Sequence, residues 1–257
     1  MAILAGMSRF LKSNPGSYRD ALLREAEGLR LLAGTLARAG VAGVRVPQVW
    51  AVDEQTLELT RIESVPATDR LWARLGQGLA QLHRVPQSSY GLAQDNYIGL
   101  APQPNGLSDN WGEFFLQRRL SYQASRIRDP VVAGEVTSVL ERQRSRLQAY
   151  LNAHCRGPSL LHGDLWSGNV LFDAQSVWLI DPAVYCGDRE ADLAMTELFG
   201  GFGAAFYRAY DEVWPRSAEY SVKRDIYNLY HALNHYNLFG AGYLPGCRRY
   251  LELIEQL

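Results

Sequence analysis

The sequence predicts an α+β fold of two unequal lobes, a small β-rich lobe over residues 1–63 and a larger helical lobe over residues 64–257. Short strand-like runs surround a single helical segment in the first lobe, whereas helical periodicity dominates the second. The chain has 257 residues, 47% of them hydrophobic, which is enough to bury a sizeable core. It therefore forms either one two-lobed domain or two small domains.

The N-terminal lobe combines three predicted strands with one helix. The first strand covers residues 8–11 and ends at Lys12, and a Pro-Gly turn follows it. Residues 18–39 carry leucines and alanines at helical spacing on one face, which predicts a long helix. Residues 49–52 and 57–62 are predicted to form the other two strands.

The C-terminal lobe is predicted to be mainly helical. Its expected helices cover residues 69–84, 110–126, 131–153, 189–199, 202–213, 218–239 and 248–256. Residues 91–107, rich in proline, asparagine and aspartate, are predicted to be a long loop that is either functional or mobile. Three short buried strands, at residues 159–162, 170–172 and 177–180, interrupt the helices.

The most informative segment reads Leu-His-Gly-Asp-Leu-Trp-Ser-Gly-Asn over residues 161–169. Asp164, Asn169 five residues later and Asp181 twelve beyond that follow the spacing of one base and two magnesium ligands in kinase-type phosphotransferases. Because all three are expected at the ends of short strands, we predict that they face one cleft. The spacing thus indicates phosphoryl transfer.

Each of these residue types suits a part of that chemistry. Attack on a γ-phosphate requires an acceptor hydroxyl that is oriented and relieved of its proton, which the carboxylate of Asp164 can do. Asn169 and Asp181 offer the oxygen ligands that Mg²⁺ prefers. Taken singly, His-Gly-Asp is also an ordinary turn and Asp181-Pro182 an ordinary strand exit. The joint spacing favours the functional interpretation.

Lysine is rare, since Lys12 and Lys223 are the only lysines in the chain. A lysine at the end of the first strand indicates a place for a compact ammonium, where the wider arginine fork would not fit. Glu25, in the helix that follows, can pair with Lys12 as a strand lysine and a helix glutamate do in kinases. A solvated lysine and an exposed helix carboxylate are the alternative.

Composition excludes several classes of protein. The formal net charge of −1 gives no electrostatic basis for binding nucleic acid or an anionic membrane. No apolar run approaches the length of a membrane span, and the three cysteines lack metal or redox spacing, so we expect a cytoplasmic protein. His231 and His235, four residues apart, lack a nearby third ligand for zinc.

Several motifs together resemble those of the fructosamine kinase (ketosamine-3-kinase) family. They lie at residues 95–99, 102–105, 111–119, 161–169, 181–183 and 187–194. The resemblance covers about residues 8–240. It implies a protein-kinase-like two-lobed fold in a branch close to the aminoglycoside and choline kinases.

The resemblance also implies an activity, namely ATP-dependent phosphorylation of the 3-hydroxyl of ketosamines such as fructosamine or ribulosamine adducts, free or protein-bound. The product ester is unstable and releases the amine, which makes the reaction a deglycation, or protein repair. Position by position, Asp164 becomes the base, Asn169 and Asp181 the magnesium ligands, Lys12 the phosphate clamp and Glu25 its partner. The implied cofactors are ATP and Mg²⁺.

Three further points concern the surroundings of this site. Trp166 either lies against the sugar of the substrate or packs the loop, since a large aromatic side chain buries area in both roles. Asp188 and Asp192 are expected to be structural, as acids at the N-terminus of a helix that favour the helix dipole and hold the catalytic loop through hydrogen bonds. A small-molecule kinase of the aminoglycoside or choline type is the alternative function, and the oligomeric state is left open.

The N-terminus departs from the family pattern. Kinases of this type cover the phosphates of ATP with a glycine-containing hairpin upstream of the strand lysine, whereas here only residues 1–7 precede that strand. We therefore expect a truncated N-terminal lobe that lacks most of the hairpin. A start site upstream of Met1, a weakened enzyme and a pseudokinase that acts as a binding protein are the three explanations.

Overall fold

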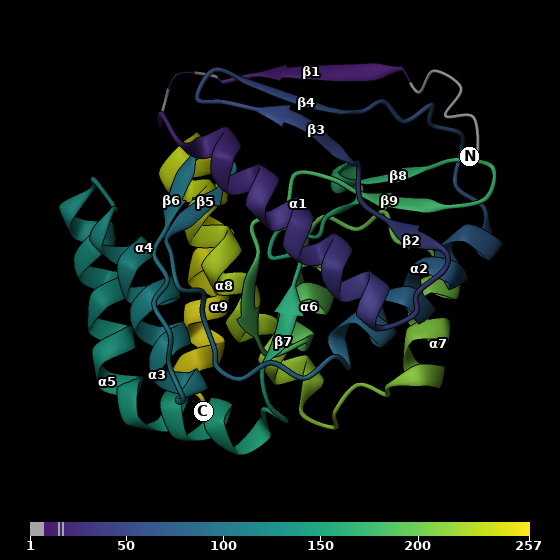
Figure 1. Cartoon of the computed structure of the whole chain (residues 1–257). Helices are drawn as coiled ribbons and strands as arrows, with labels where there is room; N and C mark the ends of the chain where they lie inside the picture. Colours follow the sequence, from purple (N-terminus) through teal and green to yellow (C-terminus); the bar gives the residue numbers. More distant parts are fainter. Residues whose placement is uncertain (1–7, 15, 17) are drawn as a thin grey trace.

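The computed structural model describes residues 8–14, 16 and 18–257. Figure 1 shows a small sheet with one long helix above a larger, mainly helical body, which confirms the predicted α+β fold of two unequal lobes. The predicted loss of the glycine-rich hairpin concerns residues 1–7, which lie outside the described residues. The same is true of Pro15 in the predicted Pro-Gly turn.

The sheet of the small lobe has three antiparallel strands in the order β1-β4-β3. Their bounds are Arg9–Ser13 for β1, Thr56–Thr60 for β4 and Val49–Val52 for β3. Helix α1, Ala21–Arg38, buries its apolar face against this sheet. The register of β1 places Lys12 opposite Leu57 and on the side of α1.

The helices of the large lobe follow the predicted periodicity closely. They are α2 (Asp69–His83), α3 (Trp111–Phe115), α4 (Tyr122–Ser125), α5 (Pro130–His154), α6 (Glu190–Leu198), α7 (Ala204–Val213), α8 (Tyr220–Phe239) and α9 (Leu244–Glu255). A π-helical turn over Leu116–Ser121 joins α3 to α4, so the predicted helix at 110–126 is one helical segment with a wider middle. Helix α9 begins four residues before the predicted start.

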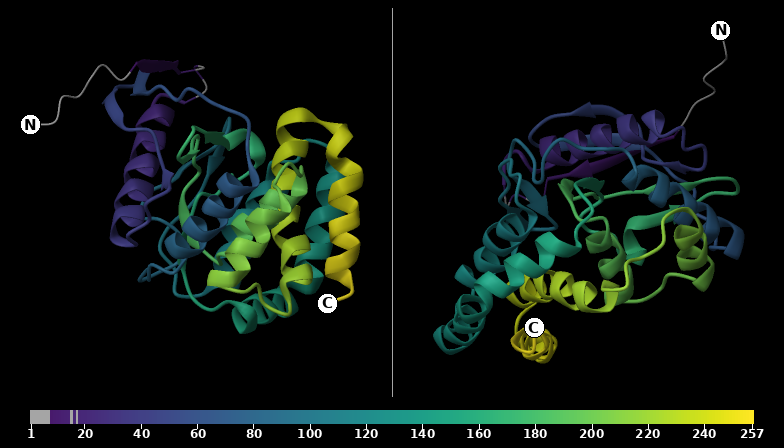
Figure 2. Two further views of the ribbon diagram at one scale, coloured as in Figure 1. Left: turned by 90° about the vertical axis from the view of Figure 1, so that its right-hand side faces the viewer. Right: turned by 90° about the horizontal axis from the view of Figure 1, so that it is seen from below.

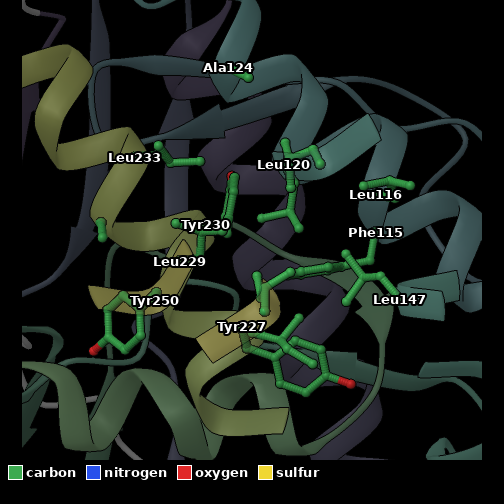
Figure 3. Packing of buried hydrophobic residues seen from close by; sticks show 14 of the residues in the cluster. Phe115, Leu116, Leu120, Ala124, Leu147, Tyr227, Leu229, Tyr230, Leu233 and Tyr250 are labelled. Carbon is green, nitrogen blue, oxygen red and sulfur yellow. The ribbon is translucent and has the colours of Figure 1, made fainter. Parts of the chain in front are cut away.

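The core of the large lobe joins α3 and α5 to α8 and α9. Figure 3 shows Phe115 and Leu147 from the first pair of helices facing Tyr227 and Tyr230 from α8. Figure 2 places α9 on the side of the molecule opposite the small sheet and α1. Among the described residues no helix is both long and apolar enough to cross a membrane.

The three predicted strands around the site are present as β7, β8 and β9, and four further short strands accompany them. The predicted strands run over Ser159–Leu161, Val170–Phe172 and Val177–Leu179. The additional ones are β2 (Val44–Arg45), β5 (Asn96–Ile98), β6 (Ala101–Gln103) and β10 (Tyr185–Gly187). The predicted loop at 91–107 therefore contains the β5–β6 hairpin, because a glycine turn lets its short arms pair.

The two lobes share part of their core. Strand β2 pairs in parallel with β9 of the large lobe, Val44 lying opposite Val177. Leu32 and Leu36, near the C-terminal end of α1, belong to the same buried cluster as α2 and α7. The division at residues 63 and 64 therefore stays a prediction, since residues on both sides of it build this cluster.

Candidate active site

A cleft with a volume of about 340 Å³ is lined by both lobes. The six residues singled out from the sequence all line it, and they are Lys12, Glu25, Asp164, Trp166, Asn169 and Asp181. They come from β1, α1, the loop after β7, the 3₁₀ turn at Ser167–Asn169 and the end of β9. The expectation that the three oxygen donors face one cleft is therefore confirmed.

The loop that carries Asp164 is held by one buried carboxylate. Asp192, in α6, accepts hydrogen bonds from the backbone N–H groups of His162 at 2.7 Å and Gly163 at 2.9 Å. A side chain at Gly163 would meet the carbonyl oxygen of Ala183 at 2.0 Å, and its φ is +83°. Only glycine fits this approach, and the predicted supporting role of Asp192 is confirmed.

Asp188 has the structural place predicted for it at the start of α6, where its Oδ1 accepts a hydrogen bond from the backbone N–H of Glu190 at 3.0 Å, but it does not hold the catalytic loop. Its carboxylate accepts hydrogen bonds from the ammonium of Lys223 at 2.9 Å and the hydroxyl of Tyr227 at 2.8 Å, both in α8. It therefore ties the start of α6 to α8 rather than holding the catalytic loop. The sequence could not reveal this because Lys223 lies 35 residues further along the chain.

The carboxylate of Asp164 is half-buried and hydrogen-bonded. Burial raises the pKa of its carboxyl to about 7, the charge of Asp181 adds to the increase, and the hydrogen bond from Asn169 opposes it. The Nδ2 atom of Asn169 donates to the carbonyl oxygen of Asp164 at 2.8 Å and to its Oδ2 at 3.2 Å. A carboxylate with a pKa near 7 is suited to take up a proton at neutral pH.

Lys12 joins the two lobes at the cleft. Its ammonium lies 2.8 Å from Oε2 of Glu25 and 3.0 Å from Oδ1 of Asp181. Burial works to lower the pKa of Lys12, but the charges of Glu25 and Asp181 outweigh it and raise the pKa. The ammonium is therefore charged at neutral pH, and the solvated alternative for Lys12 and Glu25 is wrong.

Asp181 sits in a strained backbone conformation. Its φ of +51° is the only positive φ of a non-glycine residue within the described part of the chain. Such strain costs free energy and is concentrated at functional sites, and aspartate tolerates it better than most residues. The turn points the carboxylate toward Lys12 instead of continuing strand β9.

The β5–β6 hairpin fixes the segment that follows Asp181. Asn96 donates from Nδ2 to the carbonyl oxygen of Val184 at 2.8 Å, and Gln103 donates to that of Ala183 at 3.0 Å. Both side chains are buried, so these hydrogen bonds are shielded from water. The sequence analysis did not predict that Asn96 and Gln103 hold this segment. The signal for it is the pair of amide side chains on either side of the turn at Gly99.

A second cavity, of about 480 Å³, adjoins the cleft and shares Asp164 and Trp166 with it. We call it the aromatic groove, after the five rings that line it, which are Trp166, Phe199, His235, Phe239 and Tyr243. Trp166 is 40% exposed and also covers Gly168, so it both packs the loop and faces the cavities. The sequence did not reveal the other four members of the groove.

Solved structures place the fold in the protein-kinase-like class. An ADP-bound aminoglycoside phosphotransferase has a TM-score of 0.62 with this chain at 17% identity, over 96% of this chain and 87% of that one. A putative fructosamine-3-kinase from Thermobifida fusca is more similar, with a TM-score of 0.84 at 30% identity, over 98% and 87% of the two chains. The similarity to the aminoglycoside phosphotransferase, at 17% identity, shows the fold alone.

Sequence comparisons then give the family. The family model for fructosamine kinase matches residues 3–256. A probable ketoamine kinase of Synechocystis is 39% identical over 95% of this chain and 81% of its own length. The chain belongs to the fructosamine kinase family, as the motifs predicted, and it is an ATP-dependent small-molecule kinase.

Proposed function

We propose that the chain transfers the γ-phosphoryl group of ATP to the 3-hydroxyl of a ketosamine, such as a fructosamine or ribulosamine adduct. One observation carries this proposal, namely that Asp164 lines both the cleft beside Lys12 and the aromatic groove. A kinase needs its nucleotide and its acceptor alcohol to meet at one carboxylate, since the reaction depends on holding the two in line.

The transfer step assigns a role to each residue. Asp164 accepts the proton of the acceptor hydroxyl while that oxygen forms a bond to the γ-phosphorus. The bond between the γ-phosphorus and the bridging oxygen breaks, and ADP leaves with its electron pair. Lys12, held by Glu25, binds the phosphates, and Trp166 lies against the apolar face of the sugar.

The donor set suits Mg²⁺, which would neutralise charge on the phosphates. Asn169 uses Nδ2 to bond Asp164, so its amide oxygen is the atom left for a cation. Asp181 is 47% exposed at the cleft and adds a carboxylate oxygen. Hard oxygen ligands of this kind, few in number, are those of Mg²⁺ sites that also retain water.

The consequence for the cell is deglycation. A phosphate ester on the 3-hydroxyl of a ketosamine is unstable, and its breakdown releases the amine that had been glycated. The chain thereby repairs glycated amines.

The decisive experiment supplies ATP and Mg²⁺ with fructosyl-lysine, ribulosyl-lysine and a panel of aminoglycosides, and measures ADP release. We expect turnover of the ketosamines and none of the aminoglycosides. The groove favours this outcome because Asp164 is the only acidic residue among its described lining residues, whereas polycationic acceptors need several carboxylates. Turnover of aminoglycosides alone would contradict the proposal.

Lys12→Arg is expected to lower kcat/KM for ATP by about tenfold to a hundredfold, because the planar guanidinium cannot occupy the place of a compact ammonium between Glu25 and Asp181. Initial rates over a range of ATP concentrations measure the change. Arg9→Lys on the same strand is the matched control. Arg9 pairs with Glu58 at the surface, and its exchange should leave the kinetics unchanged.

A further inference from the structure

The β5–β6 hairpin cannot keep its place by backbone pairing alone. It is a two-stranded sheet with arms of three residues each, and no third strand joins it among the described residues. Isolated ribbons of this size are marginally stable in water. Yet the hairpin holds the segment behind Asp181, whose strained backbone persists only where the surrounding structure over-determines it. Side chains of other elements must therefore anchor the hairpin.

Arg119 provides one anchor. It lies in the π-helical turn between α3 and α4, and turns of this kind are frequent at functional sites. Its side chain is fully buried, and its two terminal nitrogens donate to the carbonyl oxygen of Pro104 at 2.6 Å and to Oδ1 of Asn105 at 2.8 Å. Both acceptors follow directly after β6. The guanidinium therefore ties the exit of the hairpin to the helical core.

The charge of Arg119 has no counter-ion beside it. All its hydrogen bonds within the described residues go to neutral oxygens, and its Nε atom has no partner there. The rings of Tyr185 and Phe114 cover the guanidinium, with their centres at 4.0 Å and 4.8 Å. Burial of a charge without a counter-ion is costly, and an apolar side chain would fill the space without that cost. Core packing alone therefore does not account for an arginine here.

Tyr230, in α8, provides the second anchor. Its hydroxyl donates to Oε1 of Gln103 at 2.9 Å, and both side chains are buried. The amide nitrogen of Gln103 is thereby left to donate to Oδ1 of Asn96 at 2.9 Å and to the carbonyl oxygen of Ala183 at 3.0 Å. The hydroxyl thus fixes which way round the amide of Gln103 lies.

The two anchors give the hydrogen bonds of this network one direction. A guanidinium only donates and a backbone carbonyl only accepts, whereas an amide side chain can present either its oxygen or its nitrogen. With Oδ1 of Asn105 facing Arg119, its Nδ2 faces Oδ1 of Asn96 at 2.9 Å. The Nδ2 atom of Asn96 is then the one that faces the carbonyl oxygen of Val184. A buried network whose amides are all satisfied is rigid.

We propose that Arg119 and Tyr230 are positioning residues for phosphoryl transfer, which act through the amides of the β5–β6 hairpin to keep Asp181 in its strained conformation at the cleft. Neither of the two lines the cleft. The inference rests on the metal role given to Asp181 in the proposed function and adds the residues that hold this carboxylate. A loosened network lets the turn at Asp181 relax, and the carboxylate then leaves the place where it serves the cation.

The test measures the affinity for a non-hydrolysable ATP analogue by calorimetry, once with Mg²⁺ and once with EDTA. Tyr230→Phe removes a single hydroxyl, and it should weaken binding of the Mg²⁺ complex by about threefold to tenfold, as for one lost hydrogen bond. Binding in EDTA should stay unchanged. Arg119→Met should weaken the Mg²⁺ complex at least as much, and Arg119→Lys, which keeps a donor, should recover part of the loss.

Hydrogen exchange gives a second readout, in the absence of nucleotide. The peptide that contains Ala183 and Val184 should take up deuterium faster in Tyr230→Phe and Arg119→Met than in the wild type. The reason is that this segment opens more often once the partners of its carbonyl oxygens are no longer fixed.

Tyr227→Phe is the matched control. Tyr227 lies one turn before Tyr230 in α8 and is equally buried, but its hydroxyl donates to Asp188, outside this network. The control should lower the melting temperature and leave both the Mg²⁺-dependent affinity and the exchange of the Ala183 peptide at the wild-type level. Wild-type values of both quantities in Tyr230→Phe, or equal changes in Tyr227→Phe, overturn the inference.

Asp181→Asn separates this failure from that of the proposed function. If this variant loses no Mg²⁺-dependent affinity, the metal role of Asp181 is wrong and the inference falls with it. If it loses that affinity while Tyr230→Phe does not, the inference alone is overturned. Neither measurement uses an acceptor, so absence of ketosamine turnover overturns the proposed substrate and leaves the inference standing.

Discussion

Asp164→Asn is expected to lower kcat by about a hundredfold to ten-thousandfold, because the amide cannot accept the proton of the acceptor hydroxyl. The side chain keeps its size, so the fold and the KM for ATP should change little. Rates of ADP release under saturating substrates measure the loss. Asp109→Asn, at an exposed position away from the cleft, is the matched control and should retain full activity. A variant Asp164→Asn with more than a tenth of the wild-type kcat would contradict the role of the base.

The same carboxyl sets the pH dependence that accompanies this result. Since its pKa is raised to about 7, kcat/KM of the wild type should fall as the pH drops below 7.

The unfolded carboxyl has a pKa near 4, so ionisation in the folded state costs stability as the pH rises from about 4 through 7. Asp164→Asn should therefore unfold at a higher temperature than the wild type at pH 8, by a stability gain of about 1–2 kcal/mol, and lose this advantage at pH 4.

Lys223→Met is expected to lower the free energy of unfolding by about 3–5 kcal/mol. The Lys223 side chain is only 2% exposed, and its ammonium lies 2.9 Å from Oδ2 of Asp188 and 2.6 Å from Oε2 of Glu190. Removing it leaves the buried carboxylate of Asp188 without an ion-pair partner and that of Glu190 with Arg189 alone. Urea denaturation at pH 7 followed by circular dichroism gives the value.

The neighbouring residue supplies the control for this variant. Arg224 pairs with Glu197 and Asp225 at the surface, and Arg224→Met should change the free energy of unfolding by less than about 1 kcal/mol. Equal destabilisation by the two variants would show that the buried ion pairs contribute no more than a surface bridge. In that case another group compensates Asp188 and Glu190.

Features that depend only on residues close together in the chain could be predicted from the sequence. Long helices follow from periodicity, and Asp164, Asn169 and Asp181 could be found because their spacing within one short segment is fixed by chemistry. Strands β2, β5, β6 and β10 were missed because their two or three residues are too few to show a pattern. Strand β2 forms only through its pairing with β9, which lies more than a hundred residues away.

Side chains that act through distant partners were equally hidden. Lys223 stood out by its rarity, but its place depends on Asp188 and Glu190 at the start of α6. Phe199 and Phe239 end two different predicted helices, and only the tertiary structure brings both onto the groove. Asp188 was placed with Asp192 because both open the same helix, yet their carboxylates serve different neighbours.

The core shared by the lobes holds one end of helix α1 against the large lobe. Leu32 and Leu36 pack into the core of the large lobe and hold the C-terminal half of α1 in place. Glu25 lies seven residues before Leu32, which is about 10 Å along the helix axis. A tilt of about 10° around Leu32 shifts Glu25 by roughly 2 Å. Because Leu22, Ala26 and Leu29 of α1 pack against the sheet that carries Lys12, such a tilt would carry Glu25 and Lys12 together and would change the distance from Lys12 to Asp181 in the large lobe.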